Sequence, residues 1–247
     1  RLHWLNSTLF QENTVIDPYI PIQVEGNTLS FLGRKVELNQ DGLPKQIQTY
    51  FTPEMTGYSK SPMDLLYRPI ELNLAETGHS GMLTGTKSQL EFTSKSPGTV
   101  ARTAITGNKH LQMVVQGTLE FDGFMTYSIQ LVPQTDISLQ DINLQIPFNK
   151  SVAKYMMGLG QMGGKRPAAF DWNWDVAHKN QDGAWIGDVN GGLQYSLRDE
   201  NYSMPLNTNF YLQKPLNLPR SWGNDNKGGI RIQEDEKGVV VNNYSGD

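Results

Sequence analysis

Two tryptophans one residue apart in the run DWNWD are the first feature that points to chemistry. If the run is extended, Trp172 and Trp174 project to one side, because successive side chains of a strand alternate between its faces. Side-by-side indoles can stack on the apolar face of a pyranose ring, while nearby carboxylates and amides bind its hydroxyls. The alternative is that both indoles pack into the core, where tryptophan is usually buried. DWNWD therefore indicates either a sugar-binding surface or a core strand.

Further candidate ligand residues lie in the same stretch, between Gly158 and Leu193. Trp185 offers a third aromatic face, and the charged side chains around it can hydrogen-bond to sugar hydroxyls. The residues that we predict to contact carbohydrate are Arg166, Trp172, Trp174, Asp175, Trp185 and Asp188.

The D-x-N-x-D spacing within DWNWD is also typical of the start of an EF-hand calcium loop. Val176 and Asp182 stand where that loop requires glycine and glutamate. A different oxygen-rich calcium site could use Asp182 and Asp188. However, Asp182 and Asn190 each precede a glycine, and turn chemistry explains both without a ligand. We therefore expect no cofactor, with calcium as the alternative.

The run Gly158-Leu-Gly160-Gln-Met-Gly163 matches the GxGxxG pattern of dinucleotide sites. Such a site needs a strand before the glycines and a helix after them, so that the pyrophosphate meets a helix N-terminus. Here a short helix is expected before the glycines, and Pro167 follows them. We interpret this run as a loop.

No catalytic residue is predicted from the sequence. Hydrolysis of a glycosidic bond requires two carboxyls about 5 to 10 Å apart, and the acid pairs 199–200 and 235–236 have the composition of solvated turns. GxSxG and HExxH are absent, and the four histidines lack ligand spacing. An aldose-epimerase-like enzyme would need a histidine and a carboxylate in one cleft, which the sequence neither shows nor excludes.

Composition argues against several classes of partner. The net charge is −4, with scattered lysines and arginines, so no basic surface for nucleic acid is expected. No apolar run approaches the ~20 residues of a membrane span. The chain has 24 glycines, 13 prolines and no cysteine, which favours a turn-rich fold without disulfides or thiolate metal sites.

The elements that must position these residues are short strands. From residue 2 to about residue 132, β-like runs alternate with turn pairs at 25–27, 41–42, 107–108 and 122–123. Residues 125–132 have the period of two that is typical of a strand with one buried face. In TDISLQDINLQIPF the apolar phase slips at Gln140-Asp141, which predicts a β-bulge there.

Helix is scarce in the sequence. Ser151–Met157 is predicted to form about two turns and Pro62–Leu66 one turn. After Leu193, strands are expected at 193–197, 209–212, 229–232 and 238–241. The predicted fold class is all-β, a large antiparallel β-sandwich of the supersandwich type with one or two short helices, in a single domain over residues 1–247.

Several runs resemble a known family. They are RLHWLNST, VEGNTLSFLGRKVEL, YMMGLGQMGGKRP, DWNWD, DGAWIGDVNGGLQYSLRDENY, LNLPRSWGNDNKGGI and VNNYSGD. They resemble the β-sandwich region of large, mostly uncharacterised glycoside hydrolases from glycan-degrading bacteria. These proteins are similar to family 123 in the carbohydrate-enzyme classification, which includes β-N-acetylgalactosaminidases.

The resemblance implies a sandwich placed ahead of a (β/α)8 barrel, in a bacterial protein exported for polysaccharide degradation. In such enzymes the catalytic acid pair belongs to the barrel. This sequence has no alternating βα pattern, so no catalytic residue is carried over. We expect a non-catalytic domain from a longer chain, periplasmic, cell-surface or extracellular, with a glycan and the adjoining barrel as partners. The alternatives are a stand-alone carbohydrate-binding module, a purely structural domain and the epimerase-like enzyme.

Overall fold

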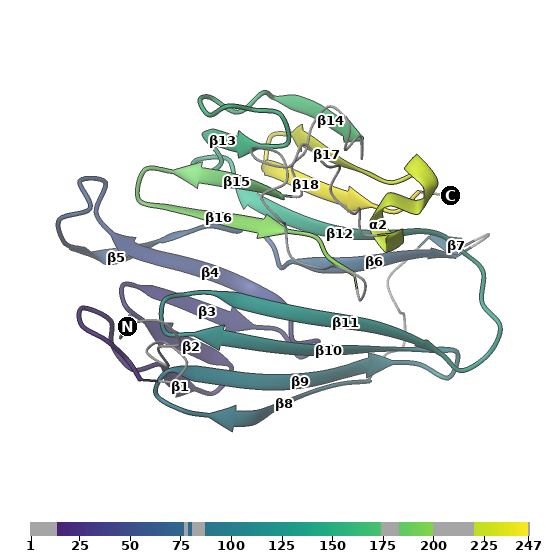
Figure 1. Cartoon of the computed structure of the whole chain (residues 1–247), viewed down its shortest axis with the longest axis horizontal. Helices are drawn as coiled ribbons and strands as arrows, with labels where there is room; N and C mark the ends of the chain where they lie inside the picture. The colour runs from purple at the N-terminus through teal and green to yellow at the C-terminus, as the bar shows by residue number, and fades with distance from the viewer. Residues whose placement is uncertain (1–13, 77–78, 81–86, 174–182, 200–219, 247) are drawn as a thin grey trace, which may run out of the picture. The chain divides into compact units, whose positions relative to one another are not determined.

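The computed structural model describes residues 14–76, 79–80, 87–173, 183–199 and 220–246 (Figure 1). In these ranges the helical segments are α2 (Arg220–Gly223) and η1 (Asn224–Asn226), and all other elements are strands. No helix within these ranges is long and apolar enough to span a membrane. The strands pair antiparallel throughout the described sheets. The predicted all-β, antiparallel class is confirmed.

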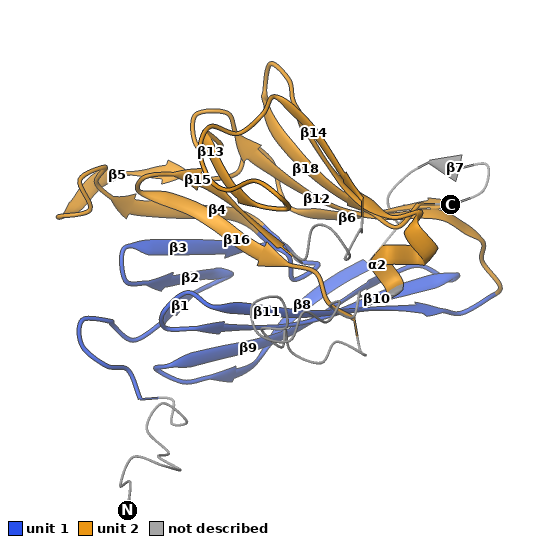
Figure 2. Cartoon of the chain, turned by 45° about the horizontal axis from the view of Figure 1, so that its top comes forward, with its two compact units in different colours: residues 1–44, 85–135 blue, residues 45–84, 136–247 orange. Residues whose placement is uncertain are grey.

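Contacts divide the chain into two compact units, coloured blue and orange in Figure 2. Unit 1 contains residues 1–44 and 85–135, and unit 2 contains residues 45–84 and 136–247. Each unit is built from two separate segments of the sequence, because residues 45–84 of unit 2 interrupt unit 1. The single domain over residues 1–247 stays a prediction.

Unit 1 contains the three-stranded meander β1-β2-β3 and a four-stranded sheet in the order β11-β10-β9-β8. Predicted turns at 25–27, 107–108 and 122–123 connect neighbouring strands. Along β10, burial alternates from residue to residue, so one face of this sheet is apolar. The strands of unit 1 are β1 (Gln23–Glu25), β2 (Thr28–Phe31), β3 (Arg34–Leu38), β8 (Lys87–Lys95), β9 (Thr99–Gly107), β10 (Leu111–Glu120) and β11 (Met125–Pro133).

A buried cation lies on the apolar face of that sheet. Arg102 is only 1% exposed, and its Cζ lies 4.8 Å from the centroid of the Tyr127 ring. Gly117 is the cross-strand neighbour of both residues, and a Cβ added to it would lie 2.8 Å from Arg102 Cζ. Arg102 Nε donates to the Gly42 carbonyl at 3.3 Å. The absence of a side chain at Gly117 therefore leaves the space that the Arg102 guanidinium occupies.

Unit 2 contains a six-stranded sheet in the order β14-β17-β18-β12-β6-β7, a three-stranded sheet in the order β13-β15-β16, and the hairpin β4-β5. Its strands are β4 (Pro44–Phe51), β5 (Tyr58–Asp64), β6 (Glu71–Glu76), β7 (His79–Ser80), β12 (Leu139–Asn149), β13 (Tyr155–Gly158), β14 (Ala169–Asn173), β15 (Gly183–Asp188), β16 (Gly191–Ser196), β17 (Gly229–Glu234) and β18 (Gly238–Tyr244).

The predicted β-bulge is confirmed. Leu139 pairs with Glu76 and Asp141 pairs with Ala75, so Gln140 is the extra residue of β12. The bulge corrects the phase of the apolar residues. Leu139 then lies on the same face of the sheet as Ile142, Leu144 and Ile146, which is the buried one.

Both helix predictions are wrong. Residues 151–154 form a turn and Tyr155–Gly158 is β13, which pairs with β15. Tyr155 and Met157 are 36% and 55% exposed while Met156 is 2% exposed, the period of a strand. Pro62 lies inside β5 instead, beside a register irregularity in the pairing with β4, which is a position where strands tolerate proline. Pairing with distant strands overrides the local helix preference in both segments.

The six-stranded sheet has one apolar and one polar face. A cross-strand row of the apolar face contains Trp172, Ile230, Asn243 and Leu144, and Asn243 there accepts a 3.0 Å hydrogen bond from Tyr195 of β16. The next row, on the opposite face, consists of Asp171, Arg231, Asn242, Gln145 and Glu71. The three-stranded sheet thus packs on the apolar face, and the polar face points away from that core.

Candidate functional site

Of the two predicted indoles in DWNWD, Trp172 lies in the core. The segment is extended as β14, as predicted, and Trp172 is 1% exposed in the row that contains Ile230. It therefore takes the core alternative that the sequence left open. Trp174 and Asp175 lie outside the described residues.

Arg166 holds two segments of the backbone together. Its side chain is 4% exposed, its Nε donates to the Ala153 carbonyl at 2.8 Å, and another guanidinium nitrogen donates to the Pro167 carbonyl. The third nitrogen pairs with the Glu234 carboxylate at the end of β17. With its nitrogens used in this way, Arg166 positions the loop before β14.

Asp188 lies at the end of β15 and pairs with Lys154, with 2.6 Å between Oδ2 and Nζ. Partial burial acts to raise the pKa of Asp188, but hydrogen bonds from Lys154 and from the Val189 N–H together lower it. The carboxylate is therefore ionised at neutral pH, and one oxygen is already committed to each donor.

Trp185 faces outward from the three-stranded sheet. It is half-buried, and it is in register with Met157, so that both project from the same face as Tyr155. A Cβ at Gly187 or Gly192 would lie 2.8 or 2.9 Å from indole atoms, so the ring lies over the backbone of both glycines. Tyr155, Met157 and Trp185, which we call the Trp185 face, form a part-exposed apolar surface with Gln194 beside it.

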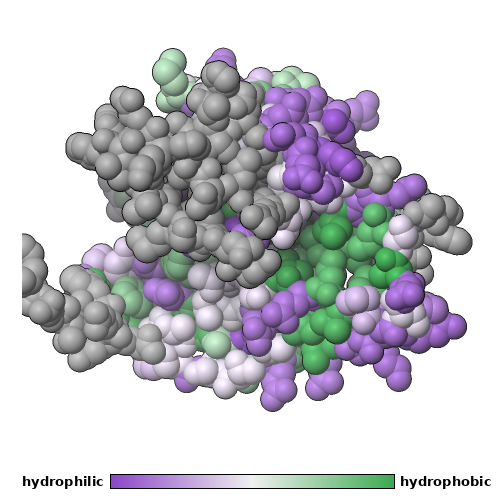
Figure 3. Space-filling view, turned by 45° about the vertical axis from the view of Figure 1, so that its right-hand side comes forward, coloured by the Kyte–Doolittle hydropathy of each residue, from purple (hydrophilic) through white to green (hydrophobic). Residues whose placement is uncertain are grey.

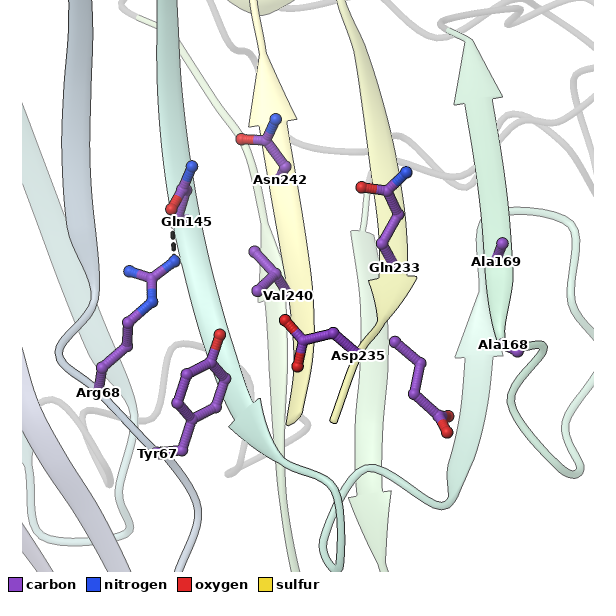
Figure 4. A pocket seen from close by; sticks show the side chains of 10 residues that line it. Tyr67, Arg68, Gln145, Ala168, Ala169, Gln233, Asp235, Val240 and Asn242 are labelled. Atoms are coloured by element: carbon purple, nitrogen blue, oxygen red, sulfur yellow. Dashed lines mark hydrogen bonds between the residues drawn. The ribbon is translucent and has the colours of Figure 1, made fainter. Parts of the chain in front are cut away.

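A second feature, a cleft of about 500 Å³, opens on the polar face of the six-stranded sheet (Figure 4). Gln145, Asn242, Gln233 and Ala169 project into it from four adjacent strands, and the segment before β6 closes one side. The residues that line the cleft are Tyr67, Arg68, Gln145, Ala168, Ala169, Gln233, Glu234, Asp235, Val240 and Asn242. None of these ten is a histidine, so the cleft does not hold the pair that the epimerase-like alternative requires.

Side-chain hydrogen bonds fix the orientation of one wall of the cleft. Arg68 donates to Glu71 at 2.8 Å and to Gln145 Oε1 at 2.5 Å. Gln145 donates to Asn143 at 3.3 Å, and Asn143 donates to Asp141 at 2.9 Å. Alternate residues of β12 and the segment before β6 therefore form one connected network.

With this geometry established, comparison with known proteins identifies the family. The family model for the glycoside hydrolase 123 third domain matches residues 22–247 of this sequence. The chain belongs to this family. The resemblance drawn from the sequence is confirmed, and the chain is a domain associated with glycoside hydrolases. No curated protein matches it significantly.

The carboxylates at one end of the cleft of this glycoside hydrolase 123 domain have lowered pKa values. Hydrogen bonds from Lys150 and Arg166 lower the pKa of Glu234, and backbone N–H groups of Gly238 and Lys237 lower the pKa of Asp235. The general acid of a glycosidase needs a raised pKa. These two groups are therefore suited to accept hydrogen bonds and unsuited to donate a proton.

Two of the carboxylates considered as calcium ligands already form ion pairs with cationic side chains. Asp171 pairs with Arg231 at 2.8 Å, and Asp188 pairs with Lys154. Over the described residues, no group of three histidine or acidic side chains could hold a metal ion. Asp175 and Asp182 lie outside those residues. The expectation of no cofactor, with calcium as the alternative, stays a prediction.

The cleft residues escaped the sequence prediction. Their only local signal is the alternation in GIRIQE and VVVNNY, which places Arg231, Gln233 and Asn242 on the outward face. Nothing in the sequence shows that β12, β17 and β18 are neighbours, because Gln145 and Asn242 are almost a hundred residues apart.

Proposed function

We propose that this domain is a non-catalytic β-sandwich of a bacterial glycoside hydrolase that acts in glycan breakdown. It supports the catalytic barrel of the parent chain and contacts the glycan through the Trp185 face. The parent is exported to the periplasm, the cell surface or the medium. Membership of the glycoside hydrolase 123 third-domain family supports a role beside the catalytic part of such an enzyme.

The Trp185 face is the observation that carries this proposal. Its indole lies over glycine backbone, which leaves the ring part-exposed and limits its freedom to move. Flat aromatic surfaces of this kind stack on the C–H face of a pyranose, and the amide of Gln194 is placed to bind a hydroxyl. The neighbouring exposed side chain, Met157, extends the apolar area.

To support the barrel, the domain needs a second exposed surface, separate from the Trp185 face, that contacts the rest of the parent chain. Met55 and Tyr58 are 50% and 58% exposed around the turn between β4 and β5, and apolar side chains also gather on the face drawn in Figure 3. Exposed apolar areas of this kind are typical of contacts with another protein surface. These areas favour attachment of the domain to the rest of its parent chain.

The test is a titration of the 247-residue chain with neutral oligosaccharides from a glycan array, followed by calorimetry on the best-bound member. Trp185→Ala should weaken binding at least tenfold, about 1.4 kcal/mol, with a moderate fall in melting temperature. Ile105→Ala is the matched control, because Ile105 is 48% exposed on a strand of unit 1. Unchanged affinity in a folded Trp185→Ala variant would rule out the Trp185 face as the contact.

A further inference from the structure

The polar cleft on the six-stranded sheet contains a buried acceptor without a donor. Asn242 Oδ1 is inaccessible to solvent and has no hydrogen-bond partner within the described part of the chain. Buried polar atoms are nearly always paired, and an unpaired one destabilises the fold. Asn242 stands between Gln145 and Arg231 in the cross-strand row, at one end of the cleft (Figure 4). An external donor would satisfy it once the side chains that cover it move aside.

Other hydrogen-bonding groups lie around the same space. Asp235 uses Oδ1 to accept the N–H groups of Lys237 and Gly238, at 2.7 and 2.9 Å, which leaves Oδ2 as an acceptor. Gln233 is exposed and adds an amide that can donate and accept. A ligand with several hydroxyls matches this mixture, because each hydroxyl both donates and accepts.

The cleft is also preorganised. The network from Arg68 through Gln145 and Asn143 holds one wall in a single arrangement. The ring of Tyr67 lies against the backbone of Gly238, where a Cβ would come within 2.4 Å of the ring. Groups that are already ordered lose little conformational entropy on binding, so even a small ligand can be held.

Charge selects the kind of ligand. The charged lining residues and their ion-pair partners comprise three cations and three carboxylates, so they carry no net charge. They are Arg68, Lys150 and Arg166 against Glu71, Glu234 and Asp235. Each cation already has a carboxylate partner, and Asp235 would repel an anion. This balance favours a neutral ligand.

The floor of the cleft supplies apolar contact. Val240 lies beside the ring of Tyr67, and Ala169 lies on the far side of Gln233 (Figure 4). A sugar ring has the same division into hydroxyls and C–H groups. We propose that this cleft is a second carbohydrate site, which binds one neutral sugar residue and uses Asn242 Oδ1 as an acceptor.

This inference goes beyond the proposed function, because the cleft and the Trp185 face share no residue. The two sites can therefore fail separately. Binding lost in Trp185→Ala and kept in cleft variants would leave the proposed function intact and overturn the cleft. The opposite pattern would confirm the cleft and overturn the Trp185 face.

The experiment records amide chemical shifts of the isotope-labelled 247-residue chain during titration with galactose, glucose, N-acetylglucosamine and N-acetylgalactosamine. At least one should shift amides of β12, β17 and β18, while glucuronate and galacturonate shift none of them. Shifts produced only by the two uronates, or shifts confined to other strands, would overturn the proposal.

Two variants test the named residues. Asn242→Val should raise the Kd of the bound sugar at least tenfold and keep or raise the melting temperature, because it removes an acceptor without a partner and adds a residue suited to a strand. Gln116→Val, an exposed position on β10, is its control. Gln233→Ala should raise the Kd about threefold, with Gln130→Ala on β11 as control. Unchanged sugar affinity in both cleft variants would overturn the inference.

Discussion

Lys154 Nζ lies 2.6 Å from Asp188 Oδ2, so the turn before β13 is bound to the end of β15 by an ion pair. The hydrogen bond raises the pKa of Lys154, and together with the Val189 N–H it lowers the pKa of Asp188 despite partial burial of the carboxyl. The pair joins the neighbouring ends of β13 and β15, and Trp185 lies on β15. Its contribution to stability must therefore depend on pH.

The first prediction concerns that dependence. Asp188 has a folded pKa below its unfolded value of about 3.9, so its contribution is present above that value and is lost as pH falls through the folded pKa. For Lys154, the contribution is present below its unfolded pKa of about 10.4 and is lost as pH rises through the raised folded pKa. Asp188→Asn should lower the melting temperature near pH 7 and converge with the wild type at both extremes. A constant difference across all pH values would contradict this account.

The second prediction compares two cations that share one carboxylate. Arg166→Ala should reduce the free energy of unfolding by about 1–3 kcal/mol, because it leaves the Ala153 and Pro167 carbonyls without this donor. Lys150 also pairs with Glu234, at 2.7 Å, but its side chain is 55% exposed. Lys150→Ala should therefore cost only about 0–1 kcal/mol. Urea unfolding of the two variants measures both free energies. Equal losses would show that Arg166 does not hold the two backbone segments together.

The third prediction concerns Gly117 beneath Arg102. Gly117→Ala would place a Cβ 2.8 Å from the guanidinium, and overpacking of this kind costs about 1–3 kcal/mol. Gly57→Ala is the control, since no atom lies within 4 Å of its added Cβ and its backbone is not in the left-handed region. Thermal unfolding should separate the two variants, and similar melting temperatures would be the contrary result.

The fourth prediction separates the roles of two tryptophans. Trp172→Ala should lower the free energy of unfolding by about 3–5 kcal/mol, because a fully buried indole is removed from the core. In the fraction that remains folded, the affinity for oligosaccharide should be unchanged. Trp185→Ala should cost less stability than Trp172→Ala, because its indole is part-exposed, and should weaken the affinity at least tenfold. Urea denaturation of each variant gives the free energy of unfolding, and calorimetric titration of the folded variant gives the affinity.

Local patterns predicted the features that depend on neighbouring residues. The apolar phase slip at Gln140 predicted the bulge, and the turn pairs predicted several strand ends, because period and turn chemistry act over a few residues. The segment Ser151–Met157 was mispredicted because its partner strand lies about thirty residues further along the chain. A helix preference over two turns is weak, and pairing with β15 outweighs it.

The candidate sites show the same limit. Alternation in DWNWD correctly indicated that it is extended, but which face is buried depends on pairing with β17, and that placed Trp172 in the core. The cleft depends on the register of β12 with β18, which brings Gln145 opposite Asn242. The sequence of neither strand alone predicts this register, so the cleft could be recognised only from the folded sheet.

The most direct test of the central claim, that this domain binds glycan without hydrolysing it, is a single calorimetric titration of the 247-residue chain with the best-bound neutral oligosaccharide. We predict a saturable isotherm in which the heat returns to baseline after every injection and no product is present in the cell afterwards. Continuous heat with accumulation of cleaved sugar, or the absence of any binding heat, would contradict the account.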